Sequence, residues 1–416
     1  MLFPLTLPPK ITDRLTKASL IQLQLFKWAA YTEEASLEAC RDWLQNHGEL
    51  QDRAEAICSW IDNSEKRRNR LLDFARCAER AEKTQWAERI IEEHDRLLHA
   101  AQGELEALPE AKRNKPLPAW QTNGKNLLIL FYDELRSEAG LPKTLFADNT
   151  KFTAQDYLLE FQTANSKVII CPFCQEMAYC TITRDRIYTD IDHYFPKDLY
   201  PHLSIHPYNL IPICHACNSG MKLSKDPLKY DDQPRRTLEH IWTPYRSRGL
   251  NDRIALEVQA DEKHRPQFVQ FIPLQEDESV VVALDILNNI YRTLERWQQR
   301  NDVIGEKVFR RIRDFIRFFH LNDPEHVHDH IGPYLQELIY WLEQEDMPRE
   351  PYTIPMMWWL VYLIAEELSD SETPFAQELR DCFGDVAQHA RRRQERGAEL
   401  RQWHQDRKAQ HAATSE

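Results

Sequence analysis

The chain has little of what marks a secreted or membrane-spanning protein. Residues 1–5 contain no basic start followed by an apolar run, which a secretory signal needs. The longest apolar stretch, 355–365, is well short of the ~20 residues that cross a bilayer. Nine cysteines, an odd number, argue for a reducing compartment and against a disulfide framework. These absences predict a soluble, cytoplasmic protein that does not associate with membranes.

Net positive charge is also lacking. The formal net charge is −13, whereas Lys and Arg supply most of the non-specific affinity of nucleic-acid-binding proteins. The acidic residues are concentrated in the helical flanks, and a group of lysines and arginines lies in 222–236. Because the local sign of the charge matters more than the total, this basic segment leaves a phosphate-containing ligand possible there.

Apolar residues recur at helical spacing over most of the chain. The stretch 13–108 is almost free of glycine and predicts several long amphipathic helices. Another helix is expected over 126–139, with Gly140 and Pro142 just beyond its end. Helical spacing returns at 280–298 and recurs at 303–319, 331–342 and 354–368, whereas 386–408 is expected to be a solvated helix or a frayed tail.

The pattern between these helical regions is that of short strands. Strands are expected at 168–170, within a hairpin over 179–191, at 209–213, and in a second hairpin formed by 254–258 and 268–272. The expected fold class is therefore mostly α with a small α+β module. We predict a helical N-terminal domain, a helical connector, a cysteine-containing module, a β-hairpin extension and a helical C-terminal domain, at 1–115, 116–167, 168–230, 231–277 and 278–416.

Two CxxC pairs, Cys171/Cys174 and Cys214/Cys217, bracket a gap of 39 residues. Each pair can grip one metal ion, and a tetrahedral set of four thiolates has no open position for chemistry. We therefore predict a structural zinc ion held by all four. Four unrelated buried cysteines are the alternative. Cys180 is off this spacing and is expected to be a core thiol.

Asp192 and His193 lie between the two thiol pairs. A carboxylate suits Mg²⁺, and an imidazole can deprotonate water near neutral pH. Strand alternation sends the two side chains to opposite faces, so they reach one site only if the strand bends or ends there. Asp190 shares the face of Asp192 and is an alternative metal carboxylate. Three further histidines are close enough in sequence to replace a predicted ligand, namely His202, His206 and His215.

The order of these features resembles the HNH endonucleases, whose ββα-metal motif is often braced by two CxxC zinc knuckles. The resemblance covers roughly 171–229 and runs through Asp192-His193, Asn209, a strand, the second CxxC pair and Asn218. It implies that His193 is the general base that activates water. It also implies that Asp192 and Asn218 hold a catalytic Mg²⁺ or Mn²⁺ ion, while Asn209 orients the His193 ring or braces the loop.

Two positions differ from the commonest form of that family. Most members carry histidine where this chain has Asn218, although the asparagine variant is well represented. Members often place a lysine three positions after the last ligand, where this chain has Met221 and then Lys222. We assign Lys222 to contact with the substrate phosphate, and a solvated helix lysine is the alternative.

The resemblance predicts a metal-dependent HNH endonuclease that hydrolyses DNA phosphodiester bonds. Similar architectures occur in bacterial anti-phage defence, where an HNH subunit is paired with an ATPase, as in Septu-type systems. Long acidic helical flanks suit protein recognition better than DNA recognition. We therefore expect them to bind a partner protein such as an ATPase, or to form a homo-oligomer.

Two other interpretations remain. In the first, a zinc-stabilised module binds nucleic acid or protein without catalysis, and Asp192, His193 and Asn218 are incidental. In the second, a restriction-like enzyme recognises modified bases through its flanks, although the sequence has no aromatic-cage signature. RNA is an alternative to DNA as the substrate.

Overall fold

A computed structural model gives the arrangement of the chain, which is mostly helical with small antiparallel sheets, as the predicted fold class required. It describes residues 5–46, 48–109, 116–146, 149–166, 171–174, 189–230, 235–247, 249–250, 253–260, 266–274 and 276–299. These fall into two compact units, one containing 5–166 and 189–246, the other 171–174 and 247–299. Among the described residues, no helix combines the length and apolar character needed to span a membrane.

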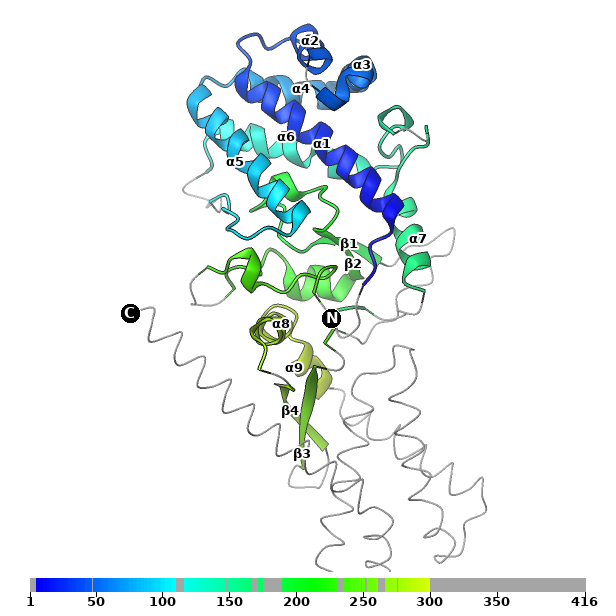
Figure 1. Cartoon of the computed structure of the whole chain (residues 1–416), viewed down its shortest axis with the longest axis vertical. Coiled ribbons are helices and arrows are strands. Elements are labelled where there is room, and N and C mark those ends of the chain that lie inside the picture. Colours follow the sequence, from blue (N-terminus) through cyan, green and yellow to red (C-terminus); the bar gives the residue numbers. More distant parts are fainter. Residues whose placement is uncertain are drawn as a thin grey trace, which may run out of the picture. The chain divides into compact units, whose positions relative to one another are not determined.

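Helices make up the amino-terminal part of the larger unit, as the apolar spacing predicted (Figure 1). They are α1 (Pro9–Tyr31), α2 (Leu37–Asn46), η1 (Gly48–Arg53), α3 (Ala54–Asp62), α4 (Glu65–Ala75), α5 (Arg80–His99), α6 (Ala119–Arg136), η2 (Lys143–Leu145) and α7 (Ala154–Ala164). Local chemistry sets several ends. Pro9 lies in the first turn of α1, where no N–H is needed, and Thr153 and Asp156 form a capping box on α7.

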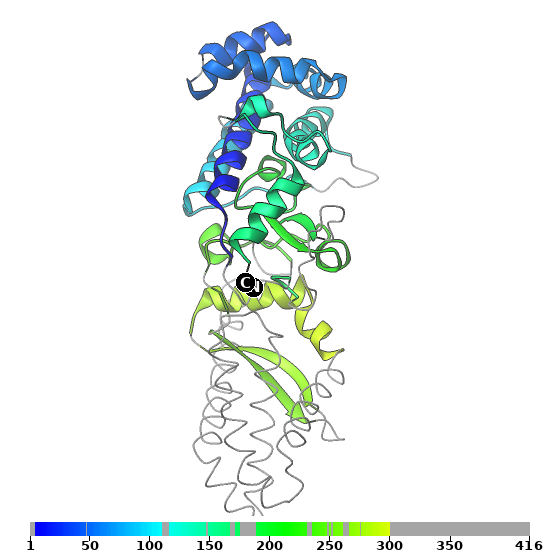
Figure 2. The same cartoon turned by 90° about the vertical axis from the view of Figure 1, so that its right-hand side faces the viewer.

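An aromatic cluster joins α1, α4, α5 and α6. Phe26 stacks on Phe74 with ring centroids 4.5 Å apart, and Trp86 meets Phe26 edge-on at 5.0 Å. Gly124 of α6 faces this cluster, and a Cβ there would lie 2.4 Å from the Trp86 ring. A side chain at this position would therefore push α6 outward. Figures 1 and 2 show α1 and α5 side by side along this core.

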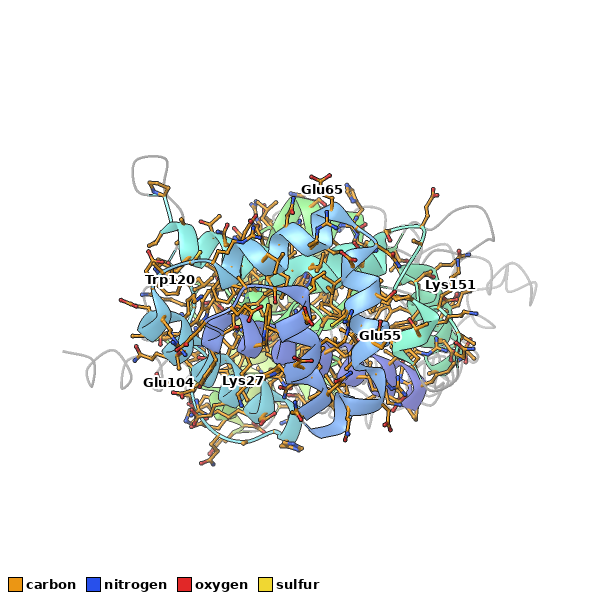
Figure 3. All side chains as sticks on the ribbon, turned by 90° about the horizontal axis from the view of Figure 1, so that it is seen from above. Lys27, Glu55, Glu65, Glu104, Trp120 and Lys151 are labelled. Atoms are coloured by element: carbon orange, nitrogen blue, oxygen red, sulfur yellow. The ribbon has the colours of Figure 1, made fainter. Side chains whose placement is uncertain are left out.

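The outer surface of these helices carries the acidic side chains that the sequence concentrated there. Glu55 of α3 and Glu65 of α4 are exposed, as is Glu104 in the segment after α5, and all three are labelled in Figure 3. Exposed carboxylates of this kind keep their hydration and contribute little to the packing of the helices.

A small module of two strands and a short helix follows in the same unit. Strand β1 (Thr189–His193) pairs antiparallel with β2 (Leu210–Cys214), with His193 opposite Leu210. The return strand expected at 209–213 is thus confirmed. The loop between them contains η3 (Pro201–Leu203), and a short π-helix, η4 (Ala216–Lys222), follows β2 directly. Of the hairpin predicted over 179–191, residues 179–188 lie outside the described part.

The smaller unit contains the second hairpin that the sequence predicted. Strands β3 (Ile254–Ala260) and β4 (Pro266–Pro273) pair antiparallel, with a register shift between Glu257 and Val258. The helix expected over 280–298 is instead two helices, α8 (Glu278–Asn289) and α9 (Thr293–Gln298). The break lies at Arg292, whose φ of +52° is incompatible with a continuous α-helix.

Two aromatic residues hold the first thiol pair within the smaller unit: Tyr291, between α8 and α9, and Trp297, in α9. The Trp297 indole N–H donates to the Cys174 carbonyl at 2.7 Å, and the Tyr291 ring stacks on Phe173 at 3.9 Å. Backbone and ring contacts together hold the 171–174 turn. The strand predicted at 168–170 and the helical segments predicted beyond 299 lie outside the described residues.

Candidate metal and catalytic site

The four predicted zinc ligands come together. The sulfur atoms of Cys171, Cys174, Cys214 and Cys217 all lie within 4.8 Å of one another, and all four residues are buried. Thiolates about 2.3 Å from a tetrahedral zinc ion lie about 3.8 Å apart, so the group fits that ion with a slight contraction. These residues therefore form a four-cysteine group able to bind zinc. Cys180 lies outside the described residues.

Asp192 is buried beside an internal cation. Its two carboxylate oxygens lie 3.2 and 3.3 Å from Nζ of Lys222, which also donates to the His193 carbonyl at 2.6 Å. Asp192 is 5% exposed and Lys222 is 1% exposed. Burial raises the pKa of Asp192, and the ammonium group opposes that rise. Lys222 is therefore not a solvated helix lysine, and its charge is engaged by the carboxylate predicted to hold a metal.

Asn218 meets the other carboxylate of β1. Its Nδ2 donates to Oδ2 of Asp190 at 3.0 Å, and Nδ1 of His215 lies 2.9 Å from the same oxygen. The side chains of Asp190 and His215 are 33% and 75% exposed. Asp190, the alternative carboxylate in the sequence, is thus in contact with Asn218 and open to solvent.

His193 is buried at the end of β1. Its Nε2 lies 3.0 Å from the Ser204 carbonyl, and its ring packs edge-on against Tyr132 at 4.2 Å. Because a carbonyl oxygen can only accept, Nε2 carries the proton and Nδ1 keeps the lone pair. Burial lowers the pKa of His193 well below its ordinary value, and Lys197 lowers it further. The imidazole is therefore neutral at neutral pH.

Distant helices hold the carbonyl that orients His193. Ser204 Oγ donates to the Leu128 carbonyl of α6 at 2.7 Å, and Gln22 of α1 donates to Ser204 Oγ at 3.0 Å. Ser204 and Gln22 are both buried. No local motif marks either residue, since the hydrogen bonds of the Ser204 hydroxyl and the Gln22 amide join residues more than 70 positions apart in the chain.

Asn209 braces the loop between the two strands. Its side-chain amide donates to the carbonyls of Phe195 and Leu203 at 3.0 and 2.9 Å, and its oxygen accepts from the Phe195 N–H at 2.6 Å. These bonds use both donor hydrogens and one lone pair of a fully buried side chain. Of the two roles implied for Asn209, these contacts fit bracing of the loop. The His193 ring is hydrogen-bonded to the Ser204 carbonyl instead.

Two cations beside His193 were not found from the sequence. Nζ of Lys197 lies 4.9 Å from the centre of the Tyr132 ring, and the Arg136 guanidinium carbon lies 5.7 Å from it. Lys197 follows Pro196 just after β1, which is a local signal. Arg136 has none, because it reaches the site from the last turn of α6.

Strand alternation correctly separated the two motif residues. Asp192 points to Lys222 of η4, whereas His193 points to Tyr132 of α6. Tyr132 also donates to the Ile191 carbonyl at 2.8 Å. Asp192, His193 and Asn218 therefore each have a different partner in this structure.

Comparison with known proteins gives two partial similarities. The chain is 29% identical over 97 residues to Septu protein PtuB of Bacillus thuringiensis, covering 23% of this chain and 35% of that protein. It is 38% identical over 52 residues to Protein ea31 of Escherichia phage lambda, covering 12% of this chain and 15% of that protein. The matched segments thus span well under half of either relative. No protein-family model and no solved structure matches the chain.

Proposed function

We propose that the chain is a metal-dependent endonuclease of the HNH type, with its reaction centre in β1, β2 and η4. The observation that carries this is the convergence of β1 and η4. Asp190 and Asn218, 28 positions apart in the chain, meet at 3.0 Å on the strand that ends in His193. The four-cysteine group at the second thiol pair supports the same module.

His193 is proposed as the general base. A base must be unprotonated and oriented, and burial keeps this imidazole neutral while the Ser204 carbonyl holds Nε2–H. Nδ1 is then the atom that accepts the proton of water. Solvent and substrate must reach that atom, so we infer that the Tyr132 side of the ring opens when substrate binds.

Arg136 and Lys197 are proposed to contact the substrate. Both lie against the Tyr132 ring that packs on His193. Their positive charge offsets the acidic balance of the whole chain at the point where a phosphodiester would approach. Lys222, which the sequence assigned to phosphate, supports Asp192 instead in this proposal.

A divalent cation bound at the module would polarise the scissile phosphate and stabilise the leaving oxygen. The sequence pattern assigned this ion to Asp192 and Asn218, but these residues have different partners. Only one of the two carboxylates of β1 is open to solvent. The choice between them determines where substrate binds.

We further propose a role in anti-phage defence together with a partner protein. The support is the similarity to a protein named Septu protein PtuB and the acidic, exposed helices of the larger unit. The acidic helices of the larger unit are the region expected to contact the partner. Co-expression with genomic neighbours and co-purification tests this; a monomer with no companion would count against it.

Plasmid nicking with added Mg²⁺ or Mn²⁺ tests the activity. We expect the unaltered chain to nick DNA, EDTA to stop it, and His193→Ala to slow it by about 100-fold or more. His99→Ala is a matched control, because His99 is an exposed residue at the end of α5. Zinc content and thermal unfolding of each variant show that it is folded. Equal nicking by His193→Ala would remove His193 from the mechanism.

A binding module without catalysis is the second candidate. It is favoured by the burial of His193 and by the pairing of Asp192 with Lys222, which leave neither side chain free in this structure. The same assay separates the two, because a folded, zinc-loaded chain that binds DNA and never nicks it supports the binding module.

A further inference from the structure

We propose that a divalent cation binds at Asp190, His215 and Asn218 on the accessible side of β1, and not at the buried Asp192. The inference rests on the proposed function for the use of the ion: Asp190 and His193 project from opposite faces of β1, so cleavage would also require the end of β1 to bend, whereas binding of the ion does not. Binding of the ion can nevertheless be measured without any cleavage.

The three side chains already converge on one oxygen. Oδ2 of Asp190 lies 2.9 Å from Nδ1 of His215 and 3.0 Å from the amide nitrogen of Asn218. Ser219 adds a hydroxyl 3.5 Å from the same imidazole nitrogen. The carboxylate comes from β1 and the other groups from the junction of β2 with η4, so two connected elements hold the site. A small movement would place one ion among these atoms.

The mixture of oxygen and nitrogen donors suits a divalent metal whose hardness lies between that of Mg²⁺ and that of the later transition metals. A carboxylate oxygen and an amide oxygen suit Mg²⁺ and Mn²⁺, whereas an imidazole nitrogen favours Mn²⁺ and later transition metals. Turning the Asn218 amide by half a rotation presents Oδ1 to the ion in place of Nδ2. The Nε2–H tautomer of His215 leaves Nδ1 free to bind.

Exposure leaves room for a substrate oxygen on such an ion. The His215 side chain is 75% exposed and that of Asp190 is 33% exposed, so positions not taken by the protein face solvent. A catalytic metal needs such open positions, in contrast to the closed four-cysteine group.

Asp192 is a poor alternative because Lys222 already neutralises it. Nζ of Lys222 lies 3.2 Å from the carboxylate, and both residues are buried. An ion at Asp192 would have to displace this ammonium and leave it buried beside a second positive charge, which is unfavourable. No such displacement is needed at Asp190.

Titration of the full, zinc-loaded chain with Mn²⁺ tests the site, with bound ion followed by electron paramagnetic resonance. Asp190→Asn should raise the dissociation constant about tenfold or more, and His215→Ala should act in the same direction. Asp62→Asn, an exposed carboxylate paired with Arg68, is the matched control and should change nothing. The double variant Asp192→Asn with Lys222→Met removes both buried charges and should bind Mn²⁺ within about threefold of the unaltered chain.

Two outcomes would overturn the site: no Mn²⁺ binding at all, or binding lost in the Asp192→Asn, Lys222→Met double variant and kept in Asp190→Asn. The proposed function can fail separately. Mn²⁺ binding that depends on Asp190, in a chain that never nicks a plasmid, supports this site and removes the endonuclease. Nicking that is insensitive to Asp190 keeps the endonuclease and removes this site.

Discussion

Asp190 and Asp192 lie two residues apart on β1 and face the same short helix, but their surroundings are opposite. Asp190 is partly exposed and accepts hydrogen bonds from Asn218 and His215, whereas Asp192 is buried against Lys222. One carboxylate can still take a ligand, while the other already has an internal counter-ion. Position on a strand therefore predicts the face of a side chain, and burial decides whether that side chain is available.

The largest expected effect comes from removing a predicted zinc ligand, Cys214, which ends β2, the strand paired with the one that carries both Asp190 and Asp192. Cys214→Ser takes one thiolate from the four-cysteine group, and structural zinc contributes about 10–16 kcal/mol of apparent binding free energy in small zinc-folded peptides. We expect loss of zinc and loss of cooperative unfolding of the β1–β2–η4 module, measured by metal content and hydrogen exchange. Cys77→Ser, outside the group, is the control; an unchanged zinc content in Cys214→Ser would contradict the assignment.

The next largest effect is expected from disrupting the buried pair of Asp192 and Lys222. Lys222→Met leaves Asp192 as an unpaired buried charge, which costs about 3–5 kcal/mol of unfolding free energy. Urea unfolding measures the loss, and adding Asp192→Asn should recover most of it.

The pH dependence of the stability loss in Lys222→Met tests whether Asp192 is the group left unpaired. Burial holds the pKa of Asp192 above its unfolded value of 3.8, so the folded state binds the proton more tightly and stability falls as pH rises. In Lys222→Met the penalty should be largest at neutral pH and shrink as pH falls toward 3.8. A penalty independent of pH would mean that Asp192 is not the group left unpaired.

Buried histidines extend the comparison. Burial lowers the pKa of His193 and of His206 well below 6.5, so the unfolded chain takes up protons first and stability falls as pH drops below 6.5. Each should contribute about 1.4 kcal/mol per pH unit in that window. Urea midpoints between pH 5 and 7.5 measure the slope. His206→Gln should reduce it by one proton.

The smallest expected effect concerns the cations on the Tyr132 side. Lys197→Met removes one charge from the proposed phosphate contact and should reduce the slope of log KM for nicking against log salt by about one. Lys151→Met, at the exposed residue labelled in Figure 3, serves as the control. Equal salt slopes for the two variants would place the substrate elsewhere.

Much of the fold followed from the sequence because its signals are local. Helical spacing predicted the helices of 13–108, and alternation with β-branched residues predicted β2, β3 and β4. The four cysteines were found from their spacing alone. The prediction of one helix over 280–298 was wrong, because the apolar spacing continues across Arg292 although the positive φ of this residue interrupts the helix.

The partners of the candidate site could not be predicted in the same way. Lys222 reaches Asp192 because η4 is a short π-helix, and apolar spacing does not specify that winding. Ser204 and Tyr132 contact His193 through packing of separate elements, without a motif. The sequence placed Asp190 and Asp192 on one face, but only the folded chain distinguishes a paired carboxylate from an open one.

The Mn²⁺ concentration that gives half-maximal plasmid nicking tests the central claim most directly, when the unaltered chain is compared with Asp190→Asn. The account predicts metal-dependent nicking by the unaltered chain and a requirement about tenfold or more higher in Asp190→Asn. No nicking at any Mn²⁺ concentration, or the same requirement in both proteins, would contradict it.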